Sequence, residues 1–203
     1  RKMKKKSALL IMILFISTFS YGRINNIRQN NIFLQQVRKQ EDTLPKKVVH
    51  DFYKWYINDI YMKDNYSYTI PSYKKYGPKK YGLDIITYKK KILSIPYFSN
   101  NYKIFLIKRC EKCNKDMLSD LWDEEPEPFF NIPSCSFLWK LEWFGNQEEK
   151  NNKFTILPKV KRYKNNYYYY VQSYIGDEKF TLYKIRVVKE ESKFKIDHIS
   201  TEN

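Results

Sequence analysis

Asp197 and His198 are the neighbours that most suggest acid–base chemistry, because a carboxylate can orient an imidazole that acts as a general base. They lie in KFKIDHIS, residues 193–200. Alternating apolar and polar residues predict a strand there, and consecutive side chains of a strand point to opposite faces. The Asp197 carboxylate and the His198 imidazole would then not hydrogen-bond to each other as a catalytic dyad. We expect His198 to face inward with Phe194 and Ile196. A histidine without a catalytic role is the favoured interpretation, and the alternative is a general base oriented by a carboxylate from elsewhere in the chain.

Trp55 and Asp59 lie one turn apart in KKVVHDFYKWYINDI, which has the apolar period of an amphipathic helix. They could line the mouth of a pocket with an aromatic wall and a charge. The alternative is a tryptophan beside the core next to a solvated carboxylate. The predicted buried face consists of Val49, Phe52, Tyr53, Tyr56 and Ile60.

Trp122 lies within an acidic stretch, residues 116–128, which holds six carboxylates and no basic residue. This stretch could bind a divalent cation or a basic partner, and we name Trp122 as a candidate ligand contact. The spacing is not that of a calcium loop, so no metal site is expected. An internal contact with the basic part of the chain is the alternative.

Cys110 and Cys113 have the C-x-x-C spacing of redox and zinc sites. A thioredoxin-like pair lies at the start of a helix, where the thiol pKa is lowered, whereas this pair lies near the end of a predicted helix. Zinc needs four ligands, and beyond Cys135 only distant histidines are available to complete the set. We therefore expect no cofactor, and a disulfide from Cys135 to Cys113 or Cys110 that ties the helix to the sheet.

Seven lysines alternate with tyrosines between residues 73 and 91, where Asp84 is the single acidic residue. Aromatic stacking combined with positive charge can hold an anionic polymer. No nucleic-acid-binding motif accompanies these residues, so a nucleic acid is an unlikely partner. The alternative is a solvated loop. The candidate contacts are Lys74, Lys75, Lys79, Lys80, Lys89, Lys90 and Lys91.

The whole chain of 203 residues has a formal charge of +16. Of its 38 basic residues, 31 are lysines, which recognise phosphate less specifically than arginines do. Together with abundant Asn, Ile, Tyr and Phe, the lysines are typical of an AT-rich genome, which explains much of the charge without a ligand. Five glycines and the absence of a glycine-rich loop disfavour a nucleotide site.

Residues 3–22 have the pattern of a secretory signal: three lysines at 4–6, an apolar run at 8–16, and small residues at 20 and 22. The apolar run is shorter than the about 20 residues that cross a bilayer. We expect removal after Gly22, a periplasmic or secreted bacterial protein, and no transmembrane anchor afterwards. Residues 23–43 are expected to form a linker or a loose helix.

The rest of the chain predicts an α+β fold. Helices are expected at 46–63 and, capped by Ser99, at 100–113, with an irregular stretch at 63–97 that holds one strand at 83–88. Segments rich in aromatic and β-branched residues predict strands at 137–144, 153–160, 166–175, 180–188 and 193–200. Their short connections allow only antiparallel neighbours. We expect a curved, cone-like antiparallel sheet of about four to five strands packed on the N-terminal helices.

VVHDFYKWYINDI and RVVKEESKFKIDHIS resemble exported bacterial domains of unknown function that share the cystatin-like fold of nuclear transport factor 2. The matching positions are Val49, Phe52, Tyr53, Trp55, Tyr56, Phe194, Lys195, Ile196 and Asp197. The resemblance covers residues 44–200 and implies a single domain in which a curved sheet wraps a long helix, with a cavity between them. It implies no reaction, because this superfold includes enzymes and binding modules.

These observations predict an exported binding protein that is not an enzyme, with a protein or envelope component as its partner. An envelope accessory and a protector against a toxin are two such roles. The alternatives are a small-molecule enzyme that uses His198 inside the cavity, and a lysine-rich binder of anionic polymers.

Overall fold

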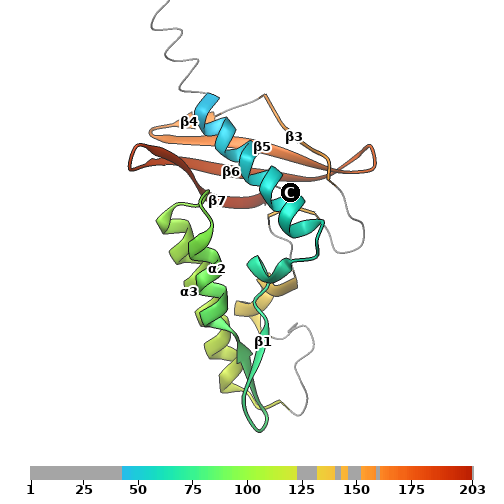
Figure 1. Cartoon of the computed structure of the whole chain (residues 1–203), viewed down its shortest axis with the longest axis vertical. Coiled ribbons are helices and arrows are strands. Elements are labelled where there is room, and N and C mark those ends of the chain that lie inside the picture. The colour runs from blue at the N-terminus through green and yellow to red at the C-terminus, as the bar shows by residue number, and fades with distance from the viewer. Residues whose placement is uncertain (1–42, 123–131, 140–142, 146–151, 159–160, 203) are drawn as a thin grey trace, which may run out of the picture. The chain divides into compact units, whose positions relative to one another are not determined.

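The computed structural model describes residues 43–122, 132–139, 143–145, 152–158 and 161–202. It has helices N-terminal to a five-stranded antiparallel sheet, so the predicted α+β class is confirmed (Figure 1). The predicted signal and all but the last residue of the predicted linker lie outside the described residues. Within those ranges no helix is both long and apolar enough to cross a membrane.

The first helix is α-helical over residues 43–55 and continues as a π-helix, η1, at Tyr56–Tyr61. A short 3₁₀-helix, η2, follows at Tyr66–Tyr68. The five residues predicted to share one face of the first helix are all buried, which confirms that prediction. A π-helix is rare and often marks a functional site, so the α-to-π junction after Trp55 is a position of interest.

Residues 63–97 are more regular than the sequence predicted. They form a hairpin of β1, Tyr73–Gly77, and β2, Lys80–Leu83, and then α2, Ile85–Ser94. The predicted strand at 83–88 is wrong because the Asp84 side chain accepts from the Thr87 N–H at 3.1 Å and thereby caps a helix. One turn of α2 separates its buried side chains Tyr88 and Ile92.

The second predicted helix is present as α3, Asn100–Ser119, and is six residues longer than expected. The apolar spacing of this segment predicts a buried face of Tyr102, Phe105, Leu106, Cys110 and Cys113, and all of them are buried except Phe105, which is 47% exposed. The predicted strand at 137–144 is wrong: Pro133–Trp139 form a 3₁₀-helix, η3. Residues 140–142 lie outside the described residues, and at the segment's other end Trp143 and Phe144 lie in a turn and are buried.

The large sheet has the order β3-β5-β6-β7, and β4 also pairs with β5. Its strands are β3 Phe154–Ile156, β4 Lys161–Tyr163, β5 Asn166–Ile175, β6 Glu178–Glu190 and β7 Lys193–Glu202. β4 lies in a stretch predicted to be a loop. Register shifts interrupt both the β5–β6 and β6–β7 pairings, and such bulges bend strands, which gives the sheet its curvature.

The first helix lies across one face of the sheet (Figure 1), and large buried aromatic side chains fill the interface between them. The ring centroid of Tyr53 is 5.8 Å from that of Phe144 and 6.4 Å from that of Tyr183, and Tyr56 is 5.5 Å from Trp143. These five side chains are at most 1% exposed. The space where a cavity was expected is therefore occupied by side chains.

Candidate functional site

A β-bulge at Asp197 changes which way the end of β7 faces. Arg186 pairs with His198 and Val187 pairs with Ile196, so Asp197 is the extra residue. Ile196 and Ile199 are both buried, and the two residues between them therefore lie on the opposite face. The prediction that His198 shares a face with Ile196 is wrong, because the bulge interrupts the alternation on which it was based.

Asp197 joins the sheet to the start of α3. Its carboxylate accepts from the Ser99 hydroxyl at 2.6 Å and is 2.7 Å from a guanidinium nitrogen of Arg186. Ser99 Oγ in turn accepts from the Tyr102 N–H, so it caps α3. Negative charge near a helix N-terminus is stabilising. Asp197 is thus held between the cap of α3 and an arginine.

His198 packs against aromatic rings of α3. Its ring centroid is 5.7 Å from that of Tyr102 and 6.0 Å from that of Phe105, both in edge-to-face arrangements. The side chain is half-buried and lies outside the packed interface between the first helix and the sheet. The Asp197–His198 neighbours therefore complete the sheet and its joint with α3, and their geometry gives no support to a general base.

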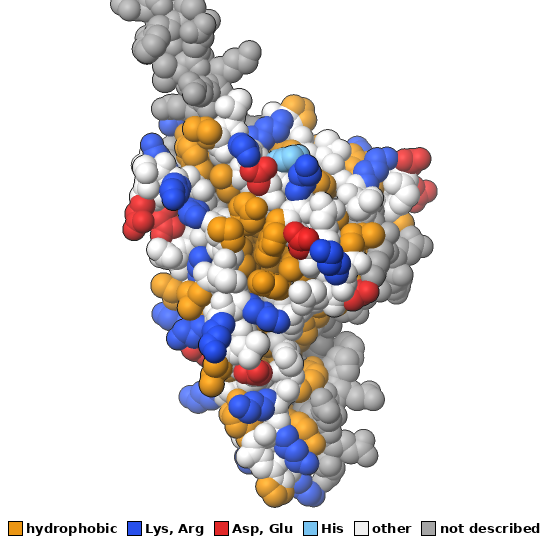
Figure 2. All heavy atoms as spheres, viewed as in Figure 1, with side chains coloured by type: hydrophobic (Ala, Val, Ile, Leu, Met, Phe, Trp, Pro, Cys, Tyr) orange, Lys and Arg blue, Asp and Glu red, His pale blue; other side chains and the backbone are white. Residues whose placement is uncertain are grey.

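Three half-buried aromatic side chains from separate segments meet at the α-to-π junction. Trp55, Tyr68 and Tyr97, which we call the Trp55 cluster, come from the first helix, from η2 and from the segment before α3. The Trp55 ring centroid is 5.5 Å from that of Tyr68, at an interplanar angle of 90°, and 5.8 Å from that of Tyr97. Phe52 lies beneath, 6.0 Å from both Trp55 and Tyr97. Figure 2 shows hydrophobic side chains gathered in the middle of the face that carries the first helix.

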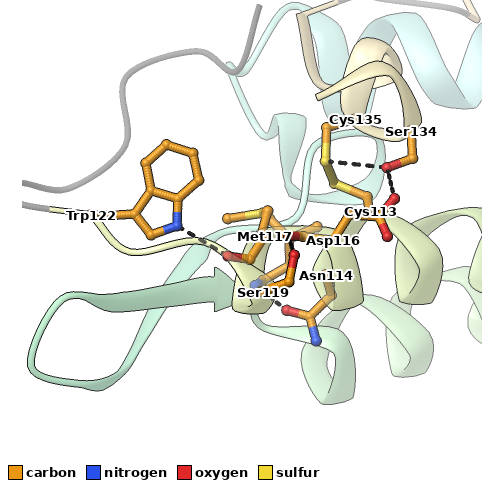
Figure 3. Close-up of a disulfide and its surroundings, with 9 residues drawn as sticks. Cys113, Asn114, Asp116, Met117, Ser119, Trp122, Ser134 and Cys135 are labelled. Atoms are coloured by element: carbon orange, nitrogen blue, oxygen red, sulfur yellow. Dashed lines mark hydrogen bonds between the residues drawn. A yellow bond between two sulfur atoms is a disulfide. The ribbon is translucent and has the colours of Figure 1, made fainter. Parts of the chain in front are cut away.

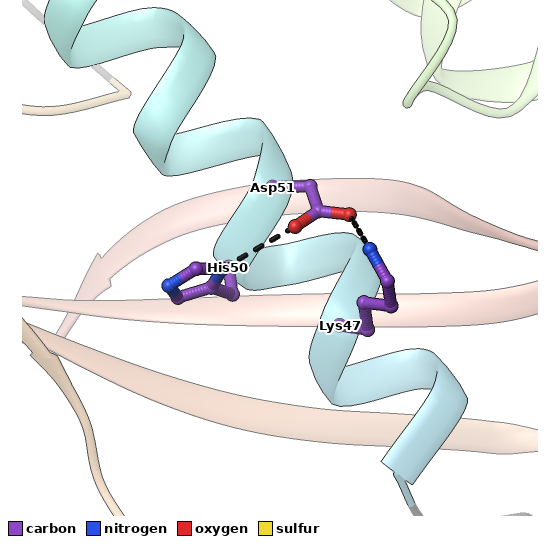
Figure 4. A network of polar contacts seen from close by, with 3 residues as sticks. All are labelled: Lys47, His50 and Asp51. Carbon is purple, nitrogen blue, oxygen red and sulfur yellow. Dashed lines mark hydrogen bonds and ion pairs between the residues drawn. The ribbon is translucent and has the colours of Figure 1, made fainter.

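Charges of both signs surround the Trp55 cluster. One turn before Trp55, the Asp51 carboxylate is 2.5 Å from Lys47 Nζ and 3.3 Å from His50 Nδ1 (Figure 4). The hydrogen bond from Lys47 lowers the pKa of Asp51. One turn after Trp55, the exposed Asp59 carboxylate pairs with Lys63 at 2.9 Å.

A further cation borders the cluster on the other side. Lys91 of α2 lies over the Tyr68 ring, 5.5 Å from its centroid, and donates to the Ser67 hydroxyl. The rim of the Trp55 cluster therefore contains two carboxylates and several amines.

Trp122 lies against different elements from Trp55. Its indole N–H donates to the carbonyl of Met117 at 3.0 Å, and its backbone N–H donates to the carbonyl of Lys79. The last carbonyls of a helix lack partners within that helix, so Trp122 terminates α3 and fixes the hairpin beside it. The two tryptophans do not share one binding surface. Of the acidic stretch, residues 123–128 lie outside the described residues.

The structure joins Cys113 to Cys135 in a disulfide, one of the two pairings that the sequence left open (Figure 3). The bond links α3 to η3, and not to the sheet as expected. Nearby, the Ser134 hydroxyl donates to Asp116 at 2.5 Å. Cys110 is a buried free thiol, and desolvation raises its pKa to about 12, so it is a poor nucleophile. Over the ranges that the structure describes, no three His, Cys, Asp or Glu side chains are grouped to hold a metal ion.

The seven candidate lysines divide between the hairpin and α2. Lys74 and Lys75 each lie over a tyrosine ring of the hairpin, at 5.5 and 5.4 Å from the centroid. Lys80 donates to the carbonyl of Leu118 at 2.8 Å, at the C-terminus of α3, where a cation is stabilising. Lys79, Lys89 and Lys90 are exposed.

Comparisons with protein-family models, with curated proteins and with solved structures found no match. The Trp55 cluster was only partly visible in the sequence, which indicated Trp55 and Asp59. Tyr68 and Tyr97 lie in short segments without periodicity, so only the three-dimensional packing brings them to Trp55.

Proposed function

We propose that this chain is an exported binding protein whose partner is another protein that docks on the Trp55 cluster. The observation that carries the proposal is the convergence of Trp55, Tyr68 and Tyr97 into one half-exposed aromatic surface. Tryptophan and tyrosine are enriched among the few residues that supply most of the binding energy at protein interfaces. Such a surface would serve an envelope accessory or a toxin-protective protein equally well.

The rim favours a protein over a polyanion as the partner. Asp51 and Asp59 flank Trp55 at one turn on either side, with lysines beside both carboxylates. A polyanion would be repelled by the carboxylates, whereas a protein surface can match both signs around an apolar centre. We therefore expect a partner that places an apolar side chain against Trp55 and basic groups opposite the two aspartates.

Export is supported by the pattern of residues 3–22 and by the disulfide, because disulfides persist mainly outside the cytoplasm. Expression of the full chain with a reporter would test it. Processing after residue 22 and recovery outside the cytoplasm are expected, and an unprocessed cytoplasmic protein would contradict it.

The binding proposal is tested by affinity capture from an envelope extract of the producing organism, with three matched baits: the wild type, Trp55→Ala and Tyr163→Ala. Tyr163 is a 63% exposed aromatic on β4 and serves as the control. Truncating a central tryptophan typically costs at least 2 kcal/mol, so we expect the Trp55→Ala protein to bind about 30-fold more weakly. A partner retained equally by Trp55→Ala would refute this docking site, provided that circular dichroism shows both variants folded.

A further inference from the structure

The outer side of α2 exposes aliphatic and basic side chains together. Ile86 is 65% exposed and Leu93 is 50% exposed. At 3.6 residues per turn these two lie about 20° apart around the helix, with Lys90 about 40° beyond Ile86 and Lys89 about 40° beyond Leu93. The buried stripe of α2, Tyr88 and Ile92, faces away from them. We call Ile86, Lys89, Lys90 and Leu93 the α2 face.

α3 extends this surface. The two helices lie side by side (Figure 1), and Lys103 Nζ of α3 donates to the carbonyl of Leu93 at 2.9 Å. Ile104, 48% exposed, follows Lys103, and the exposed Lys108 and Lys115 lie one and three turns farther along the same side. Glu111 lies between Lys108 and Lys115 on this side of α3 and is the one acidic residue there, so the surface keeps an excess of positive charge.

Charge and exposed apolar area are concentrated in this part of the chain. Residues 73–121 carry twelve basic and four acidic side chains, so half of the formal charge of +16 lies within them. Ten large hydrophobic residues are exposed in the described ranges, and six of them are here. The six are Tyr76, Ile86, Leu93, Ile104, Phe105 and Leu121.

We propose that the α2 face docks on the surface of an anionic lipid bilayer. Lysines near an anionic leaflet are attracted to its phosphates, and aliphatic side chains between them gain by leaving water for the boundary of the acyl chains. A nucleic acid or an acidic polysaccharide would use the lysines but would leave Ile86 and Leu93 in water, which is why we favour the bilayer. The inference does not depend on the Trp55 cluster, which lies on other elements.

The test measures partition of the full chain onto phosphatidylcholine vesicles with and without phosphatidylglycerol. Three double variants are compared with the wild type: Lys89→Gln with Lys90→Gln, Ile86→Ser with Leu93→Ser, and Lys161→Gln with Lys164→Gln as a charge-matched control on β4 and its turn. All six side chains are exposed, so the fold should tolerate each pair. Residues 1–22 are the same in every protein, so a difference between variants reports on the exchanged side chains alone.

We expect tight binding only with phosphatidylglycerol, and about tenfold weaker partition for each α2 pair than for the control pair. Added salt should weaken the wild type more than the Lys89→Gln, Lys90→Gln protein. Equal loss from the α2 and β4 lysine pairs would overturn the proposal, because net charge alone would then explain binding. An unchanged Ile86→Ser, Leu93→Ser protein, or equal affinity for dextran sulfate, would assign the surface to polyanions. The Trp55→Ala variant should bind vesicles like the wild type.

Discussion

Raising the pH above 10 should unfold this protein, because its core contains tyrosines that resist ionisation. Burial raises the pKa of Tyr183 to about 12, and it raises the pKa values of Tyr53 and Tyr56 above the ordinary value as well. In the unfolded chain each phenol loses its proton near pH 10. Above that pH the unfolded state binds fewer protons than the folded state, so the free energy of unfolding falls as the pH rises.

The size of the effect follows from the pKa difference. One pKa unit corresponds to about 1.4 kcal/mol, so Tyr183 alone removes about 2 kcal/mol of stability between pH 10 and pH 12. Tyr53 and Tyr56 act in the same direction. A domain of this size has a total stability of about 5 to 15 kcal/mol, so unfolding is expected before pH 12.

The assay combines tyrosine absorbance with far-ultraviolet circular dichroism during rapid pH titration. Tyr53→Phe is the informative variant, because the Tyr53 hydroxyl is buried without a hydrogen-bond partner in the described ranges. Its removal should stabilise the protein at neutral pH by about 1 kcal/mol and raise the pH of unfolding. Tyr163→Phe, at an exposed position, should change neither value. If Tyr53→Phe left the unfolding pH unchanged, or if all tyrosines ionised near pH 10 in a still folded protein, the reasoning would be refuted.

Three further predictions concern single positions. Gly82→Ala should lower the free energy of unfolding by about 1 to 3 kcal/mol in chemical denaturation, because a Cβ there would lie 2.4 Å from the Asn114 side-chain oxygen. Gly77→Ala is the control and should be tolerated, because its Cβ would lie 3.9 Å from the nearest atom. Asp84→Ala removes the cap of α2 and should lower the free energy of unfolding by about 1 kcal/mol near pH 7. The hydrogen bond from Thr87 lowers the pKa of Asp84 in the folded state, so the stability difference between variant and wild type should disappear as the pH falls through that pKa, and a difference that stays constant would contradict the cap. In Cys110→Ala, mass spectrometry should show the Cys113–Cys135 disulfide intact. In the wild type, the Cys110 thiol should react with iodoacetamide only after unfolding, and rapid labelling of the folded protein would contradict its burial.

The fold was largely predictable where apolar periodicity was long. The first helix, α3 and strands β5, β6 and β7 all have sustained patterns of burial that match their sequences. The errors fall where a local polar interaction decides the structure. The Asp84 cap created a helix in place of a strand, and the bulge at Asp197 turned His198 to the other face.

The candidate site was predictable only through residues on one regular element. Trp55 was identified because it lies on a clear helix, and its partners Tyr68 and Tyr97 were not, because they come from short irregular segments. The role of Trp122 depends on a carbonyl at the end of α3 and on the hairpin, and neither can be inferred from sequence spacing. The pairing of Cys135 was open because Cys110 and Cys113 lie on the same side of α3.

The link between Cys113 and Cys135 encloses the chain segment between them, with a sequence separation of 22. A protease that cuts anywhere inside that segment would leave two fragments that migrate as one species on a gel without reductant. Addition of dithiothreitol would release them, so a nicked preparation would pass for intact material until it was reduced.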